Sequence, residues 1–242
     1  QTSTANQRER ITDMKTTITA LAAMLALAET AATEPIKFKG EASKYTDTSV
    51  SDITNPAKWG DGESELSAEV DYVIDNGKYC GFGGTGKFPG KSLTLGVTGG
   101  NSGNLGVETE SDFDFGTLIL NKGTLDQKVA SKNVDITADI TVNADSSDPY
   151  VIRFNNGWNG RINFFGSIHG SGALRFTTTK QKDHPHMLSR VKSDMTKFTG
   201  LIKLGPDETA SSMFYRSPVL FGDTTVNGEV VVNPCGIIGP CG

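Results

Sequence analysis

Basic charge and cysteine are both scarce in this 242-residue chain, and each shortage excludes a class of function. Lys and Arg number 23 against 28 Asp and Glu, so the net charge is −5 and no basic field exists for the phosphates of a nucleic acid. The three cysteines leave at least one without a partner in the chain. Cys235 and Cys241 could close a small disulfide loop, but their glycine and proline neighbours supply no further zinc ligands. We therefore expect no nucleic-acid partner and no cofactor.

Long apolar runs are also missing. The longest, from Ile18 to Ala28, is too short to span a bilayer as a helix, so we expect no permanent membrane span. The run follows Lys15 and precedes small residues, which is the plan of a secretory signal peptide. The sequence thus predicts a signal peptide over residues 14–32, with translation starting at Met14 and residues 1–13 as a non-native upstream extension.

Glycine is plentiful, with 28 residues against nine prolines, and this favours an all-β chain with many tight corners. Short β-prone runs bounded by Gly and Asn begin near residue 70, among them "DYVIDNG", "KSLTLG", "RINFFGSIHG" and "GEVVVNP". No helical period is sustained over ten residues. We expect an irregular leader or cap over residues 33–69, with Trp59 as its large anchor, a β region over residues 70–234, and a Gly- and Cys-rich end over residues 235–242 that would fit a truncation.

The β-prone runs alternate and recur. In "VDITADITV" each apolar residue is followed by Asp or Thr, so one face is buried and the other is wet. The runs return every twenty to twenty-five residues or so, a cadence typical of a β-solenoid whose coils cover one another. The turns "NKG" and "NNG" also permit hairpins, which leaves an antiparallel carbohydrate-binding β-sandwich as an alternative.

Several segments resemble a known family. "SGALRFTTT" followed by "FTGLIKLG" is similar to autotransporter-associated β-strand repeats, and "PYVIRFNNG" with "INFFGSIHGSGALRF" resembles coils of secreted right-handed β-helix proteins of Gram-negative surfaces. "ITNPAKWGDGESELSAEVDYVIDNG" resembles the segment that precedes such helices, so the resemblance covers roughly residues 55–232. It implies an exported right-handed parallel β-helix, secreted or on the outer cell surface of a Gram-negative bacterium, and it brings no catalytic set with it.

The glycine-rich stretch "NFFGSIHGSGALRF" could be a phosphate loop, but strand-like residues on both sides leave no helix N-terminus to bind an anion. We interpret Gly170 and Gly172 as corners between strands. His169 lies at that bend, and no nucleophile in a recognisable elbow accompanies it. We expect its ring to face solvent or a neighbouring coil.

The remaining candidate sites are for binding. Asp112 and Asp114 share one face of a strand and could hold calcium or do acid–base work, whereas Trp158 could stack on a sugar ring. A metal cluster is a further candidate, formed by Asp183, His184 and His186 in "KDHPHM". The basic residues around that motif suggest a solvated loop that could meet an acidic glycan or a protein surface.

The predicted function is a secreted or cell-surface module, non-catalytic, adhesin-like or structural, with extracellular glycans or surface proteins as partners. A polysaccharide lyase or glycoside hydrolase on the same fold is the alternative, because a fold alone does not separate a scaffold from an enzyme. A lateral cleft that gathers carboxylates and a basic residue would favour the enzyme, and scattered acids would favour the scaffold.

Overall fold

The computed structural model describes residues 33–40, 52–77, 79–82, 86–107, 111–127, 133–154, 161–178, 189–205, 217–222, 225–232 and 236–240. The chain divides into two compact units, Gln1–Glu34 and Pro35–Gly242, and every strand that the structure describes belongs to the second. The predicted signal peptide, Trp158, Cys235, Cys241 and the Asp183, His184, His186 cluster lie outside the described residues. Among the described residues, no helix has the length and apolar character that a membrane crossing requires.

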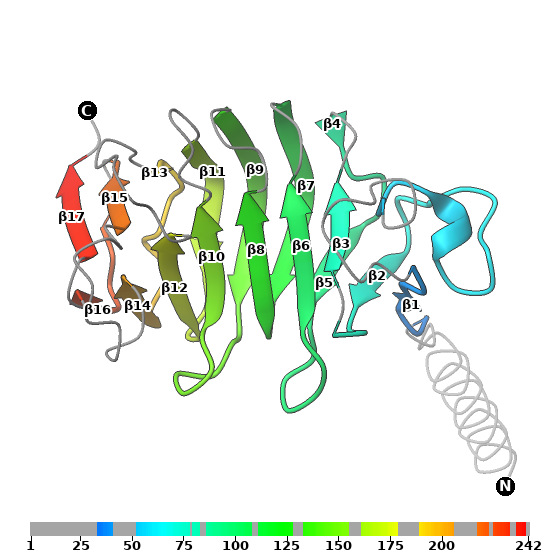
Figure 1. The fold of residues 1–242 in the computed structure, drawn as a ribbon, viewed down its shortest axis with the longest axis horizontal. Helices are drawn as coiled ribbons and strands as arrows, with labels where there is room; N and C mark the ends of the chain where they lie inside the picture. Colours follow the sequence, from blue (N-terminus) through cyan, green and yellow to red (C-terminus); the bar gives the residue numbers. More distant parts are fainter. Residues whose placement is uncertain are drawn as a thin grey trace, which may run out of the picture. The chain divides into compact units, whose positions relative to one another are not determined.

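The second unit is a right-handed parallel β-solenoid, which confirms the predicted fold. From β5 onward the chain passes alternately through two parallel sheets, so that each coil adds one strand to each sheet (Figure 1). The ten-stranded sheet contains β1 (Ile36–Lys37), β2 (Asp71–Ile74), β4 (Gly86–Lys87), β5 (Ser92–Leu95), β7 (Ser111–Leu120), β9 (Asn133–Val142), β11 (Arg161–His169), β13 (Ser189–Val191), β15 (Ser217–Phe221) and β17 (Gly236–Pro240). The seven-stranded sheet contains β3 (Tyr79–Phe82), β6 (Gly103–Val107), β8 (Gly123–Gln127), β10 (Tyr150–Phe154), β12 (Ala173–Thr178), β14 (Leu201–Leu204) and β16 (Glu229–Val232).

The core lies between the two sheets and is built from columns of apolar side chains. On the ten-stranded side Leu118, Ile140 and Ile168 are register partners and are buried. On the other side Leu125, Ile152, Phe176 and Leu204 form the matching buried column. The strict alternation in "VDITADITV" puts every second residue of β9 into this core, so the predicted split between a buried and a wet face is confirmed for this strand.

Glycines make the corners of each coil. Gly170 has a φ of 105° and, with Gly172, carries the chain from β11 to β12, which confirms their interpretation as corners. A Cβ atom on Gly170 would stand 2.4 Å from the carbonyl oxygen of Val142 in the preceding coil. Within β11, Gly166 has a φ of 89° and bends the strand beside Ala138 of β9. Close stacking of coils therefore depends on the absence of side chains at these positions.

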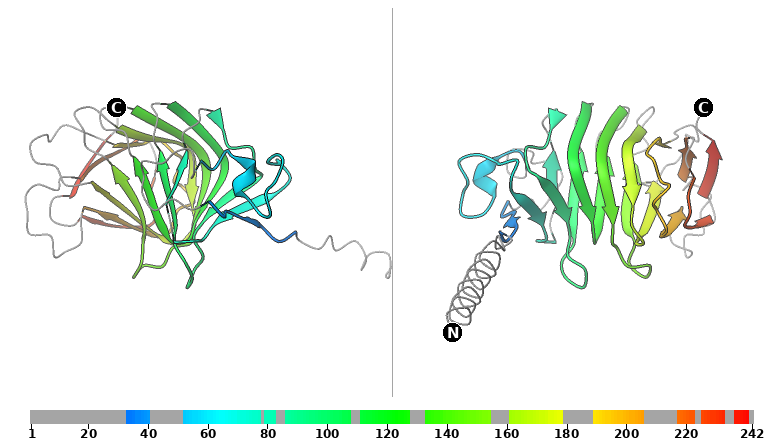
Figure 2. Two further views of the ribbon diagram at one scale, coloured as in Figure 1. Left: turned by 45° about the vertical axis from the view of Figure 1, so that its right-hand side comes forward. Right: turned by 180° about the vertical axis from the view of Figure 1, so that it is seen from behind.

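The N-terminal end of the solenoid is closed by aromatic rings. Trp59 is fully buried, packs edge-on against Phe38 and Tyr72, and donates its indole N–H to the carbonyl oxygen of Ile53 at 2.9 Å. It follows a single 3-10 turn, Pro56–Lys58, capped by the side chain of Asn55. Figure 2 shows this end of the solenoid from two further sides. The anchoring role of Trp59 thus includes sealing the first coil.

Two sequence interpretations were wrong in detail. The "NKG" turn joins β7 to β8 in the opposite sheet and does not form a hairpin, and all the paired strands described are parallel, which removes the antiparallel sandwich. The coils are also less regular than the cadence indicated. Between equivalent positions they measure 22 residues from Asn121 to Asn143 and 28 from Thr141 to His169. The reason is that loops between coils vary in length while the strands stay in register.

Candidate functional site on the ten-stranded sheet

A row of oxygen-bearing side chains crosses the outer face of the ten-stranded sheet, one from each of six successive coils. Its members, here called the hydroxyl–carboxylate row, are register partners: Asp71, Ser92, Thr117, Asp139, Ser167 and Asp194. Hydroxyls bind carboxylates along it, because Ser92 donates to Asp71 at 2.6 Å and Ser167 donates to Asp139. Since neighbouring strands lie about 4.8 Å apart, adjacent members of the row are close enough for these bonds.

The row passes through a groove at β9, β11 and the segment that follows β13. The groove has a volume of about 450 Å³ and is lined by Asp139, Ser167, Ile168, His169, Asp194 and Lys197. Its residues converge because the register places His169 beside Thr141, two positions after the pair formed by Ser167 and Asp139. We call it the His169 groove.

Asp139 is the acceptor at the centre of the His169 groove. Its Oδ1 atom accepts from the Ser167 hydroxyl and lies 3.1 Å from Nε2 of His169. The same ring nitrogen is 3.3 Å from the Thr141 hydroxyl. The ring of His169 therefore faces the neighbouring coil, which is one of the two orientations expected from the sequence. With about a third of the imidazole and more than half of the Asp139 side chain exposed, both remain accessible from solvent.

Asp194 forms the other acidic part of the groove wall. Its Oδ1 atom accepts from the backbone N–H of Thr196 at 2.9 Å. This bond, a second one from the Thr196 side chain and the nearby ammonium of Lys197 hold the pKa of Asp194 below its usual range. Asp194 is therefore ionised at neutral pH and is a hydrogen-bond acceptor there.

The geometry of the groove suits binding better than nucleophilic catalysis. Ser167 directs its hydroxyl proton to Asp139 and not to His169, so Ser167 and His169 do not form the serine–histidine pair of a nucleophilic enzyme. General-acid chemistry by a carboxyl group needs a raised pKa, and that of Asp194 is lowered. Among the described residues no group of three or more His, Cys, Asp or Glu side chains could hold a metal ion.

The two carboxylates proposed from the sequence lie on the first half of β7, outside this groove. Asp112 is exposed and Asp114 half-buried, with Phe113 and Phe115 buried on the core side, so the predicted sharing of a face is confirmed. Asp114 accepts from the N–H of Gly116 at 2.8 Å and thereby fixes the bulge in the strand. Asp112 pairs in register with Asp135, whose carboxylate accepts from Asn163 at 2.6 Å.

Sequence reasoning missed the convergence of His169 with Asp139 and Asp194. It placed Asp139 correctly on an outward face, but treated that face as ordinary wet surface. The contact depends on which residues of successive coils lie side by side. Ser167 follows Asp139 by 28 residues, and Asp194 is the bridge partner of Ser167 in the next coil; the lengths of the loops set both pairings. One feature of the sequence could have indicated the site: an Asp in one β-prone run corresponds to a Ser or Thr in a neighbouring run.

The outer face of the seven-stranded sheet differs in burial. Asp126 of β8 has 2% of its side chain exposed, and its Oδ1 atom lies 3.4 Å from the guanidinium of Arg153 on β10. Asn104 and Thr124, on the same face, are also buried.

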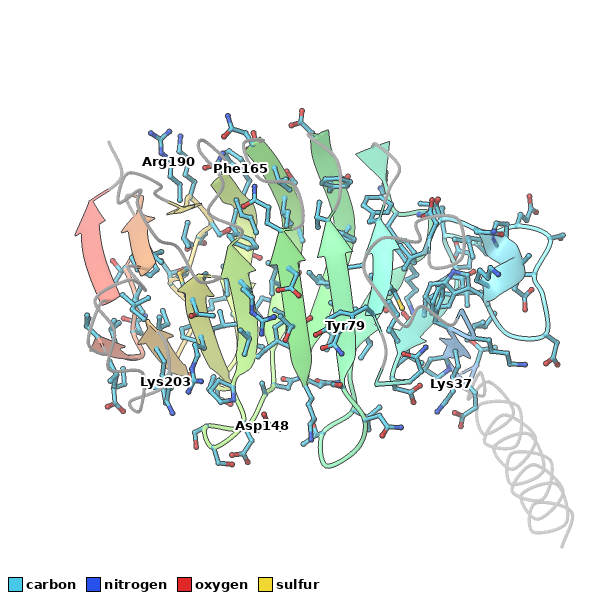
Figure 3. All side chains as sticks on the ribbon, viewed as in Figure 1. Lys37, Tyr79, Asp148, Phe165, Arg190 and Lys203 are labelled. Carbon is cyan, nitrogen blue, oxygen red and sulfur yellow. The ribbon has the colours of Figure 1, made fainter. Side chains whose placement is uncertain are left out.

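Cys80 of β3 is a free, buried thiol whose pKa is raised by burial, which makes it unreactive in the folded state. Figure 3 shows charged side chains along the margins of the solenoid, including Arg190, Asp148 and Lys203.

Comparison with known proteins gave no match: no family model, no curated protein and no solved structure is significantly similar to this chain.

Proposed function

We propose that the chain is an exported, non-catalytic β-solenoid module that presents a binding surface outside a Gram-negative cell, in an adhesin-like or structural role. The observation that supports this most is the hydroxyl–carboxylate row, which continues across five strands of one sheet, β2, β5, β7, β9 and β11, and the isolated bridge at Asp194. A parallel solenoid satisfies the backbone groups of each coil with the next, so its outer face holds side chains at fixed spacing. Such a face can bind a long ligand without rearranging.

The partners we propose are extracellular glycans or surface proteins. The test has two parts, and export comes first. The chain is expressed from Met14 in a Gram-negative host, the cells are fractionated, and the N-terminus of the recovered protein is determined by mass spectrometry. We expect an N-terminus near residues 29–33 in the periplasm or medium, and an intact N-terminus in the cytoplasm would contradict the proposal.

The second part is binding. The secreted protein is applied to a glycan array and to whole Gram-negative and host cells. Saturable binding supports the adhesin-like role, whereas an absence of binding to either would leave the structural role.

A polysaccharide lyase or glycoside hydrolase is the second candidate, because Asp139, Asp194 and Lys197 gather in one lateral groove. Incubation with a panel of polysaccharides distinguishes the two. New reducing ends or the ultraviolet absorbance of an unsaturated product, lost in Asp139→Asn, would establish the enzyme. If no such products form, the proposal of a non-catalytic binding module stands.

A further inference from the structure

The His169 groove contains both acceptors and donors that the described residues leave open. Asp139 makes both of its contacts through Oδ1, and its second carboxylate oxygen has no partner among the described residues. Lys197 lowers the pKa of Asp194 by its charge, yet the structure gives it no ion pair within the described residues. As far as the structure describes the chain, the groove therefore offers an open acceptor oxygen on Asp139 and an open ammonium donor on Lys197.

The charges of the groove select among ligand classes. Two carboxylates face one ammonium, so an anionic ligand such as a uronic acid or a phosphate would meet net repulsion. An apolar ligand would strip water from charged groups without replacing their hydrogen bonds. Hydroxyl groups avoid both costs, since each donates one proton and accepts through two lone pairs. A ligand with several adjacent hydroxyls can donate to Asp139 and Asp194 and accept from Lys197.

The size and place of the groove agree with this chemistry. A volume of about 450 Å³ is in the range of small-ligand sites. The groove lies on the hydroxyl–carboxylate row, so a chain-like ligand can continue beyond it as far as the half-buried Thr117. From these observations we infer that the His169 groove binds a neutral oligosaccharide, with Asp139 and Asp194 accepting hydrogen bonds from its hydroxyls. This inference rests on the proposed binding function and names its site and ligand class.

The experiment titrates the folded, secreted protein with four neutral probes, the hexamers of cellulose, xylan, mannan and amylose, and with oligogalacturonate as the anionic comparison. Binding is read by calorimetry and by the NMR signals of the histidine rings, with His169 assigned through His169→Gln. We expect at least one neutral hexamer to bind and to shift the His169 signals, and oligogalacturonate to bind more weakly.

Two substitutions on the same strand make the test specific. Asp139→Asn keeps the shape of the side chain and removes its charge, and we expect it to weaken binding about tenfold or more, because hydrogen bonds to charged groups are the stronger ones. Asp135→Asn is the matched control on β9. It is outside the groove and bonded to Asn163, so binding should stay within about twofold. Thermal unfolding verifies that both variants fold.

The outcomes separate the inference from the proposed function. Unchanged affinity in Asp139→Asn, or binding without a shift of His169, overturns the groove as the site while saccharide binding by the module stands. Preferred binding of oligogalacturonate overturns the neutral ligand class. Failure of all four neutral hexamers overturns the inference as well, whereas export and cell binding test the proposed function separately.

Discussion

The outer faces of the two sheets are built by the same strand geometry and differ in what they leave accessible. On the ten-stranded sheet, Asp139 and Asp194 stand open to solvent in a groove. On the seven-stranded sheet, Asp126 points away from the core and is nevertheless buried beside Arg153. A carboxylate at an outward strand position can therefore be a ligand-binding group on one face and a structural group on the other. Alternation specifies the direction of a side chain, and the neighbouring coils decide its exposure.

The first prediction, with the largest expected effect, replaces Gly166 in β11 of the ten-stranded sheet. It tests whether the close approach of neighbouring coils constrains the backbone at this position. In Gly166→Ala the new Cβ would lie 2.3 Å from the carbonyl oxygen of Ala138, at a φ of 89°. We expect a loss of about 3 kcal/mol or more in the free energy of unfolding, measured with urea, because the conformational cost and the clash add.

The control is Gly99→Ala, since Gly99 also has a positive φ, 72°, but nothing within 4 Å of the added Cβ. That variant should lose only about 1–2 kcal/mol, the conformational part. Equal losses in the two variants would mean that close approach of the coils does not constrain the bend.

The second prediction compares an ion pair from each sheet. Arg153→Met leaves the buried carboxylate of Asp126 without its cationic neighbour, and we expect the free energy of unfolding to fall by about 2–3 kcal/mol, below the full cost of a buried pair because Arg153 itself is one-third exposed.

Lys91→Met removes the partner of Asp71, a pair 3.2 Å apart that is exposed on both sides. Its cost should stay under about 1 kcal/mol, as for surface ion pairs in general. Urea unfolding of both variants measures the difference. A larger loss for Lys91→Met would contradict the contrast between the closed and the open face.

The smallest effect concerns the pH dependence of the open face. The hydrogen bond from Ser92 holds the pKa of Asp71 below its usual range; burial opposes this shift, and the smaller effect of Lys91 adds to it. A depressed folded pKa contributes stability that is present above the unfolded value and is lost as pH falls through the folded one. We therefore expect the urea midpoint to be constant near neutrality and to drop below about pH 4.

Asp71→Asn should make that drop shallower. Asp112→Asn serves as the comparison on the same sheet, because Asp112 is exposed and its substitution removes no bond that the structure describes. If the urea midpoint falls equally at low pH in Asp71→Asn and in the unchanged protein, the hydrogen bond from Ser92 to Asp71 does not contribute to the pH dependence of stability.

The fold could be predicted from the sequence because its determinants are local. Alternation in "VDITADITV" defines the buried face of β9, and glycines at positions such as Gly170 and Gly172 mark corners whatever follows them. Short strands without a strong pattern were missed. In "GNLGV" the residues of β6 are all buried, so no alternation reveals them.

The site could not be predicted to the same degree because it depends on register between coils. His169 and Asp139 meet only after a coil of 28 residues has closed, and the loops that set this length carry no periodic pattern. Asp112 and Asp114 were found because they are neighbours in one run, yet Asp114 serves the bulge of its own strand. Proximity in sequence therefore identified a strand face, and the groove required the stacking of three coils.

The aromatic cap at Trp59 has a consequence for how these molecules behave at high concentration. The first strand of the ten-stranded sheet, β1, is only two residues long, and directly after it Phe38 pairs with Trp59 in the antiparallel sense. A strand arriving from another molecule would find few free backbone donors there and the wrong chain direction for a parallel ladder. Within the described residues, the cap thus disfavours the addition of a strand from another molecule at β1, and with it fibre growth from that edge of the ten-stranded sheet.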